Sequence, residues 1–438
     1  MVKKVNMRYL ALLSVAMFAS LSVQAETLAP ADKSEFLYEM KQGDTLLALV
    51  AKYFKNAAAI NEIAKINQLK DVNKIPVGKK LLFPRSLVNS TPSKANLTSL
   101  DCAEPIQING VSKQVAVGEV LNQGSTIQIP KGCQAGLTLE DFSTVALLSG
   151  TLIKIKTLQK NPFEKSPEVE FELLNGRVEV DVPKRQAGDA PFQVRTPSSL
   201  AGVRGTKFRV AFDTEAGNSQ VEVKQGNVAA KGRVDAAAKS ITDNKGVAIA
   251  ASGVAGDVET LPSPPEFLSY QKLKSTTGFG LKFASAEFDL KYALVKSPDA
   301  NLASMTDEGR FDLPEIQTEQ TNASAVFYQW TAISKTGLFG NPKQYAFCAS
   351  PKGKKALCDV NFNMRGMQQV YLHIQRVSPD SKQLVDIVNS NFTITDNDQF
   401  LLKYLPPGQY QWRIEYAING GIKSRASGDF ELIAMAAD

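Results

Sequence analysis

The hydrophobic positions follow three different patterns along the 438 residues of the chain. Residues 9–23 are almost continuously apolar. Between residues 46 and 66 the apolar positions recur every three or four residues, which is the period of an α-helix. Beyond residue 102 they alternate with polar positions in short runs bounded by glycine, which is typical of β-strands. The sequence therefore predicts a mainly β protein in which a small, partly helical unit comes first.

The apolar run at the N-terminus has the flanks of an export signal. Lys3, Lys4 and Arg8 precede it, and Val23-Gln24-Ala25 ends it with small residues. This order predicts a secretory signal peptide over residues 1–25, cleaved after Ala25. An uncleaved membrane anchor is the alternative, although the run is shorter than the ~20 residues of a typical transmembrane helix.

Residues 35–84 predict a unit with the order strand, helix, helix, strand. The first residues alternate like a strand, and Gly43 permits a tight turn after it. Asp44 or Thr45 can cap the helix that follows, because their side-chain oxygens accept from free backbone N–H groups. The unit ends in a second turn and strand over residues 75–84.

In its turn Gly43-Asp44-Thr45-Leu46 and its ending Ile75-Pro76-Val77-Gly78, this unit resembles a LysM module. The resemblance implies binding to N-acetylglucosamine-containing glycans, chiefly peptidoglycan, in a shallow groove between the two turns. Free backbone groups would bond acetamido groups, and Leu46, Ile75 and Val77 would meet sugar faces. The alternative for Gly43 and Asp44 is that they only make and cap the turn. The implied glycan-binding residues are Gly43, Asp44, Thr45, Leu46, Gln68, Leu69, Lys74, Ile75, Pro76 and Val77.

Residues 86–100 lack periodicity and are rich in Ser, Thr and Asn, so they predict a linker. Residues 102–256 predict a β-rich domain in which many strands begin at a glycine. Five of these glycines lie 26, 29, 21 and 20 residues apart, at Gly150, Gly176, Gly205, Gly226 and Gly246. A loose repeat of this length favours stacked strand layers, in a short solenoid or in a β-sandwich.

This β-rich domain resembles a FecR-type domain. The resemblance rests on the stretches Leu174–Val180, Phe192–Pro197, Ala201–Val210 and Val221–Val228, which keep their order. Members of that family include the periplasmic arms of iron-uptake signal regulators. Such regulators also carry a transmembrane helix and a cytoplasmic anti-sigma segment, and neither pattern is found in this sequence.

The last part of the chain predicts two β-sandwich modules, residues 262–350 and 351–438, after a proline-rich joint. Tyr328-Gln329-Trp330 and Tyr410-Gln411-Trp412 echo each other 82 residues apart. The stretch Leu405–Ile414 resembles the turn and late strand of a fibronectin type III domain, which implies that Tyr410 sits at a tyrosine corner. Trp330 and Trp412 are expected in the sandwich cores or on their faces.

Four cysteines, Cys102, Cys133, Cys348 and Cys358, favour disulfides in an exported protein. The pairs that are near in sequence are Cys102–Cys133 and Cys348–Cys358, and buried free thiols are the alternative. None of the four forms a Cys-x-x-Cys motif, so we expect no metal site.

The composition points away from catalysis. The chain has one histidine, His373, so a histidine-based triad or a multi-histidine metal site would depend on that residue alone. Its net charge is +6, and +3 without residues 1–25 (47 basic minus 44 acidic), which is too small to indicate nucleic-acid binding. We expect no enzyme and no cofactor.

Two functions are compatible with these patterns. The first is a periplasmic or cell-envelope adaptor that binds peptidoglycan and presents its β-domains to an envelope protein that the sequence does not identify. The alternative is a periplasmic signal-sensing protein that acts through its FecR-like domain with a separate membrane partner.

Overall fold

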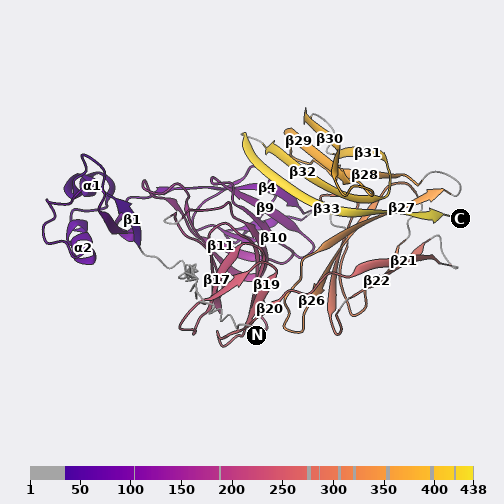
Figure 1. Ribbon diagram of the computed structural model, residues 1–438, viewed down its shortest axis with the longest axis horizontal. Coiled ribbons are helices and arrows are strands. Elements are labelled where there is room, and N and C mark those ends of the chain that lie inside the picture. The colour runs from indigo at the N-terminus through magenta and orange to yellow at the C-terminus, as the bar shows by residue number, and fades with distance from the viewer. Residues whose placement is uncertain are drawn as a thin grey trace, which may run out of the picture.

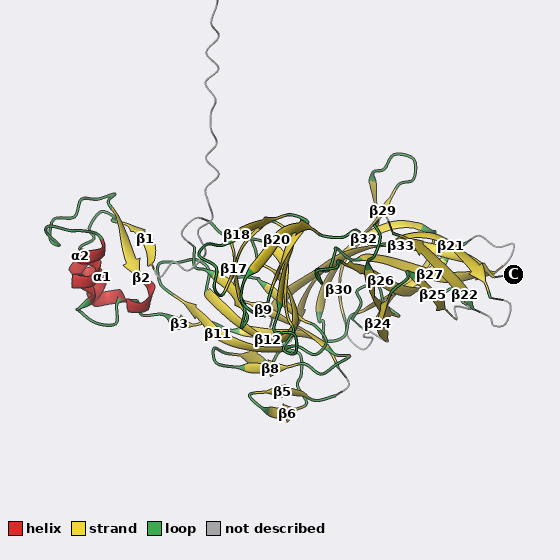
Figure 2. Cartoon of the chain, turned by 90° about the horizontal axis from the view of Figure 1, so that it is seen from below, coloured by secondary structure: helices red, strands yellow, loops and turns green. Residues whose placement is uncertain are grey.

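The computed structural model describes residues 35–102, 104–186, 189–273, 278–285, 287–303, 307–318, 322–351, 356–394, 399–418 and 421–437. The protein is mainly β, as expected, and its helices gather at one end (Figures 1 and 2). It consists of an N-terminal module (residues 35–84), a central body (residues 91–260) and a C-terminal pair of sandwiches (residues 266–437). The expected signal peptide, residues 1–25, lies outside the described residues.

The N-terminal module has the predicted order of elements: β1 (Glu35–Glu39), α1 (Leu46–Tyr53), α2 (Ala59–Ile66) and β2 (Lys80–Pro84). The two strands pair antiparallel. Helix α1 begins where Thr45 accepts a hydrogen bond from the Ala48 amide at 3.1 Å. Both helices turn their apolar residues toward the strands and bury them in one small core.

The expected linker over residues 86–100 is largely absent. A 3₁₀ turn at Arg85–Leu87 leads into β3 (Thr91–Pro92) and β4 (Ala95–Asp101), and β4 pairs with β9 of the central body. Polar composition misled the prediction, because Ala95 and Leu97 alternate with Asn96 and Thr98 and are fully buried. The central body therefore begins before residue 102.

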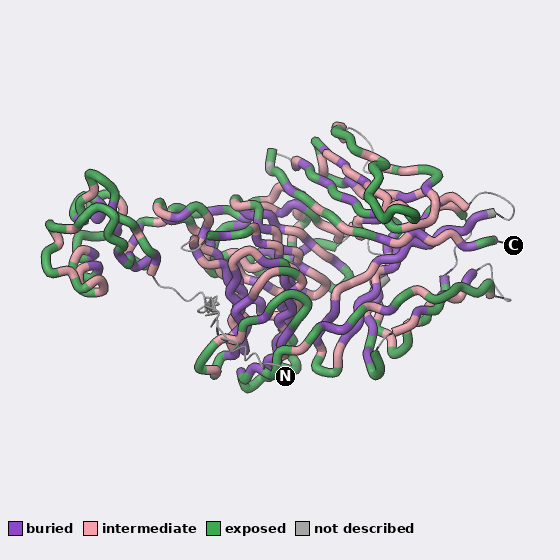
Figure 3. Tube along the Cα trace, viewed as in Figure 1, coloured by how far each residue is buried: buried purple, intermediate pink, exposed green. Residues whose placement is uncertain are grey.

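The strands of the central body form one closed, barrel-like unit, and their apolar side chains make one core. Buried residues recur along these strands (Figure 3). Beyond β3 and β4 the strands are β5 (Ile106–Ile108), β6 (Val111–Lys113), β7 (Val120–Leu121), β8 (Thr126–Gln128), β9 (Gln134–Leu139), β10 (Thr144–Leu147), β11 (Leu152–Lys160), β12 (Glu168–Asp181), β13 (Phe192–Arg195), β14 (Ser199–Val203), β15 (Lys207–Phe212), β16 (Ser219–Gln225), β17 (Asn227–Gly232), β18 (Lys239–Thr242), β19 (Lys245–Ile249) and β20 (Ala255–Thr260).

The pairings separate into two rows of strands, and the chain crosses between them at glycines. Strand β12 belongs to both rows: it pairs with β11 and β13 up to Asn175, and with β10 and β15 from Gly176 onward. Gly176 has φ +87°, and a Cβ there would lie 2.7 Å from the backbone Cα of Thr151. Four glycines of the sequence repeat, Gly150, Gly176, Gly205 and Gly226, have positive φ and lie where the chain crosses between the rows, whereas Gly246 lies inside β19. The expected layers of strands are therefore present as the two rows of one closed unit.

The C-terminal sandwiches contain β21 to β33 (Figure 1). Their bounds are β21 (Glu266–Lys272), β22 (Phe279–Ala284), β23 (Lys291–Ser297), β24 (Asp307–Phe311), β25 (Glu315–Thr318), β26 (Val326–Ile333), β27 (Lys343–Pro351), β28 (Cys358–Asn363), β29 (Gln369–Val377), β30 (Leu384–Thr393), β31 (Gln399–Leu405), β32 (Gly408–Ile418) and β33 (Ile422–Ala437).

The two predicted sandwich modules are not separate at residue 350. In the described part of the chain, one sheet runs through both in the order β24-β23-β26-β27-β33-β32-β29-β30. The join is the parallel pairing of β27 with β33, which brings the last strand of each half together. Two smaller sheets, β21-β22-β25 and β28-β31, complete a two-layer arrangement for each half. The sequence echo was correct, but the pairing between its halves is a long-range contact that no local pattern encodes.

Both tryptophans lie in the sandwich cores, as expected: Trp330 is fully buried and Trp412 is 7% exposed. The Tyr410 hydroxyl donates a hydrogen bond to the Pro406 carbonyl at 2.6 Å, which is the geometry expected of a tyrosine corner. Both predicted disulfides, Cys102–Cys133 and Cys348–Cys358, are formed.

The sandwiches join the central body through the loop between β26 and β27. Phe339 at its tip is buried, with the Arg177 guanidinium 3.3 Å from its ring centroid. Its amide donates to Glu222 at 2.7 Å, and Arg209 donates to the Gly340 carbonyl at 2.7 Å. The loop thus satisfies buried charged groups of the central body.

Replacing the corner glycine in Gly176→Ala should destabilise the central body by about 2–5 kcal/mol, because it adds both a strained φ and a clash with the Thr151 backbone. The matched control is Gly132→Ala, where φ is +78° and no atom lies within 4 Å of the new Cβ, so only about 1–2 kcal/mol is expected. Denaturant unfolding measures both variants. Equal losses would contradict the role of Gly176 as a packed corner.

Candidate functional site

The two turns that were predicted to form a glycan groove lie side by side in the N-terminal module. Met40, just before the first turn, donates its amide to the Lys79 carbonyl at 3.0 Å. Its carbonyl accepts from the Gly78 amide at 2.7 Å. Residues 41–45 therefore neighbour residues 74–78, although about thirty positions separate the two turns in the chain.

The first turn is held by its own polar side chains. Asp44 accepts hydrogen bonds from the Tyr38 hydroxyl at 2.6 Å and from the Lys41 amide at 2.8 Å. The Tyr38 hydrogen bond lowers the pKa of the Asp44 carboxyl below its usual value, because it stabilises the charged form. Burial and the same hydrogen bond raise the pKa of Tyr38. Thr45 caps α1. The alternative interpretation, in which such side chains make and cap the turn, therefore describes what Asp44 and Thr45 do in this structure.

The predicted residues divide into an exposed group and an inward-facing group. Leu46 is only 1% exposed, so the expectation that its side chain meets a sugar is wrong: the helix that Thr45 caps turns Leu46 into the core. Leu69 and Ile75 are half-buried and pack against that core, and Asp44 is also half-buried. The exposed members are Gly43, Thr45, Gln68, Lys74, Pro76 and Val77.

The N-terminal module is also fastened to the central body by an aromatic side chain that the sequence did not single out. Phe163 lies in the loop between β11 and β12 and reaches into the core of the module. Its ring centroid is 4.9 Å from that of Tyr53, 5.2 Å from that of Tyr38 and 5.4 Å from that of Phe36. The module therefore completes its core with a residue of another unit.

A buried ion pair lies next to this contact. Arg85, which follows β2, has Nη2 2.5 Å from Oε1 of Glu164, and both side chains are less than a tenth exposed. Nη1 of Arg85 donates to the Glu35 carbonyl at 2.7 Å. Burial raises the pKa of Glu164, while Arg85 opposes that shift. Breaking such a pair leaves a buried charge unpaired, so it favours this one docked arrangement.

The sequence patterns gave no assignment for residues 161–167. The available signal was Asn161-Pro162-Phe163-Glu164, a large apolar residue in a turn between two strands. Nothing local in that stretch identifies which surface would cover the phenylalanine.

Comparison with known families identifies the central body in part. Residues 125–229 match the family described as FecR protein. The match runs from just before β8 into β17, and it contains the Phe163 loop and the glycine corners. No curated protein sequence matches the chain at a significant level.

Among solved structures, two crystal structures of a protein provisionally described as an anti-sigma factor, from Parabacteroides distasonis ATCC 8503, are similar at 23% and 24% identity with TM-scores of 0.26 and 0.25. Each match covers 31% of this chain, and the chain spans 59% of the length of those structures. A tetra-tandem repeat from the extending region of a large adhesion protein is similar at 10% identity with a TM-score of 0.14, over 79% of this chain and 93% of that one. Similarity at this level assigns no function.

Within the described ranges, no helix is long and apolar enough to cross a membrane. The same residues contain no cluster of three or more potential metal ligands among His, Cys, Asp and Glu. The two disulfides indicate an oxidising compartment.

The variant Phe163→Ala should loosen the N-terminal module, because it removes a ring that contacts five aromatic rings of that module. We expect a loss of about 2–4 kcal/mol, seen as faster hydrogen exchange in β1 and α1. The matched control is Phe288→Ala, since Phe288 is 93% exposed. Unchanged exchange in β1 and α1 of Phe163→Ala would mean that the ring does not hold the module.

Proposed function

We propose that this chain is a cell-envelope sensory protein. Its FecR-like central body receives a cue and passes it to a separate membrane partner, while the N-terminal module holds the chain on N-acetylglucosamine-containing glycan strands of the cell wall. The observation that carries the proposal is that the loop inserted into the N-terminal module lies within residues 125–229, the FecR match. A load or displacement on the module is thereby transmitted to the domain that belongs to a signalling-associated family.

The glycan-binding role rests on the arrangement of the two turns. Val77 is 66% exposed and Pro76 stands beside it, so an apolar surface is available to the C–H face of a sugar ring. Gln68 has φ +50° and an exposed side chain, so its amide group is accessible to a ligand. Lys74 adds a positive charge that is 84% exposed and suits acidic groups of the wall.

The second candidate is a scaffold that binds the wall and presents the C-terminal sandwiches to another envelope protein. The single sheet through both sandwiches favours it, since the sheet makes them one stiff arm. In both candidates the chain acts by binding, resides in the periplasm after export and performs no catalysis.

Glycan binding is tested by sedimentation of the full mature chain with purified sacculi. Val77→Glu should reduce the bound fraction at least tenfold, because the new charge must be desolvated against the sugar face. The matched control is Val111→Glu, since Val111 is 62% exposed on the central body and should leave binding unchanged. If both variants sediment with sacculi as well as the unaltered chain does, the proposal that this groove binds glycan is contradicted.

The two candidates separate when the wall is digested. Cells that express the Val77→Glu chain are treated with lysozyme, and the membranes are collected. A sensory protein that binds a membrane partner through its central body remains with the membranes and is released by detergent. Complete release into the soluble fraction would contradict the sensory role and favour the scaffold.

A further inference from the structure

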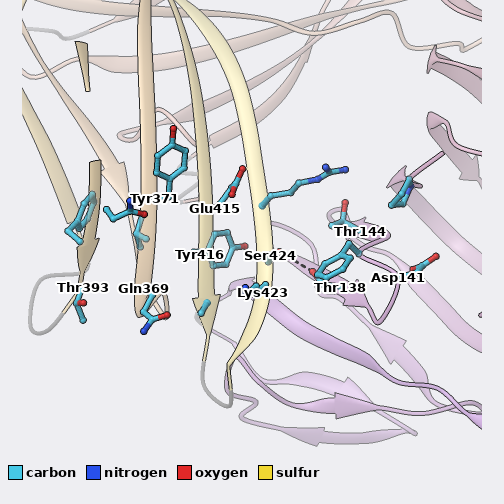
Figure 4. A pocket seen from close by; sticks show the side chains of 17 residues that line it. Thr138, Asp141, Thr144, Gln369, Tyr371, Thr393, Glu415, Tyr416, Lys423 and Ser424 are labelled. Atoms are coloured by element: carbon cyan, nitrogen blue, oxygen red, sulfur yellow. Dashed lines mark hydrogen bonds between the residues drawn. The ribbon is translucent and has the colours of Figure 1, made fainter. Parts of the chain in front are cut away.

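A cleft lies where the C-terminal sandwiches meet the central body. Its cavity measures about 780 Å³. One wall comes from the end of the eight-stranded sheet, and the other from the β9–β10 turn, whose Asp141 is labelled in Figure 4. Phe142 of the same turn also lines the cavity. Contacts between units frequently form ligand sites, and this volume is within their usual range.

The sheet side of the cleft is a flat polar face. Strand pairing sets side chains opposite one another in a row across four strands, and directly opposed residues point to the same side of a sheet. Three strand spacings of about 4.8 Å give the row a length of about 14 Å. The row consists of Asn391, Tyr371, Glu415 and Arg425.

A second row lies two residues further along each strand and therefore on the same side of the sheet. It consists of Thr393, Gln369, Ala417 and Lys423. All members of both rows line the cavity. Strands β29 and β32 are hydrogen-bonded to neighbouring strands on both sides here, so the part of the floor that they form offers side chains, and not a free strand edge, to a ligand.

The opposite wall presents an exposed aromatic side chain in an unfavourable backbone conformation. Phe142 is 57% exposed and has φ +63°. A bulky residue in that region costs roughly 1–2 kcal/mol, and no core contact repays it, since the ring faces outward. Such strain persists where the surroundings enforce it, and it is frequently associated with function.

Hydrogen bonds of neighbouring residues hold the turn at Phe142 in this conformation. Asp141 next to Phe142 accepts from Arg185 at 2.5 Å, and the Arg185 side chain is 2% exposed. Arg185 also donates to the carbonyls of Pro167 and Ala190 at 3.1 and 2.6 Å. The turn is closed by a bond from the Phe142 amide to the Leu139 carbonyl at 3.0 Å. The backbone of the turn that carries Phe142 at the cleft is therefore fixed by contacts within the chain.

The side chains that line the cleft restrict the class of ligand that it could bind. Two acids, Asp141 and Glu415, balance two bases, Lys423 and Arg425, so the cleft has no net charge to favour a phosphate backbone or a strongly ionised ligand. Most other polar groups are hydroxyls and amides, which both donate and accept. Aromatic rings beside such groups suit a ligand with an apolar C–H face and a rim of hydroxyls.

We propose that this cleft is a second ligand site, separate from the N-terminal module, and that it binds a neutral oligosaccharide with one sugar ring stacked on Phe142. The amides of Gln369 and Asn391 then bond the sugar hydroxyls across the floor. The inference does not depend on glycan binding by the N-terminal module.

The test uses the full mature chain carrying Val77→Glu, so that the first groove does not contribute. Isothermal titration with the β-1,4-linked tetramer of N-acetylglucosamine and with that of glucose should detect binding of at least one of them. Which tetramer binds separates a wall-type amino sugar from a plain glucan. Adding Phe142→Ala should weaken that binding at least tenfold, and the matched Phe288→Ala should leave it unchanged.

A second variant separates binding from folding. Phe142→Gly should abolish binding in the same way and should raise or preserve the thermal midpoint, because glycine adopts φ +63° without strain. The proposal is overturned if neither tetramer binds, if Phe142→Ala binds as well as its parent, or if Phe142→Gly lowers the thermal midpoint. None of these outcomes bears on sacculus binding by a chain with Val77 intact.

Discussion

The arrangement of the three units depends on aromatic side chains of one unit that are buried against the next unit. The N-terminal module is too small to enclose a large core by itself, and Phe163 of the central body completes it. Phe339 of the sandwiches is also buried, with its ring against the Arg177 guanidinium of the central body. In each case polar bonds surround the ring: Arg85 with Glu164, and Glu222 with the Phe339 amide.

These contacts give the FecR-like body a position between two neighbours. Its β11–β12 loop meets the N-terminal module, its Arg177 and Arg209 meet the sandwiches, and its β9–β10 turn forms one wall of the cleft. A ligand in the cleft or on the N-terminal module would therefore act on the same central body. Such an arrangement suits a protein that combines a wall contact with a second signal.

The sequence predicted those elements that depend on local hydrophobic spacing and turn residues. The order of elements in the N-terminal module followed from Thr45 and helical spacing, and the glycine corners followed from a repeat that Gly176 satisfies structurally. Long-range pairing could not be predicted from local patterns. Residues 95–100 were assigned to a linker although they pair with β9, and the pairing of β27 with β33 joins two modules that were predicted to be separate. Leu46 was misassigned because a binding motif and a core helix share that position.

The most direct test of the account measures whether the N-terminal module is fixed on the central body. Lys70→Cys and Glu215→Cys introduce one labelling site on each exposed surface, since the four native cysteines are in disulfides. Pulsed electron paramagnetic resonance between spin labels at these sites should give one narrow distance distribution in the full chain. A broad distribution, as for a flexibly tethered module, would contradict the account.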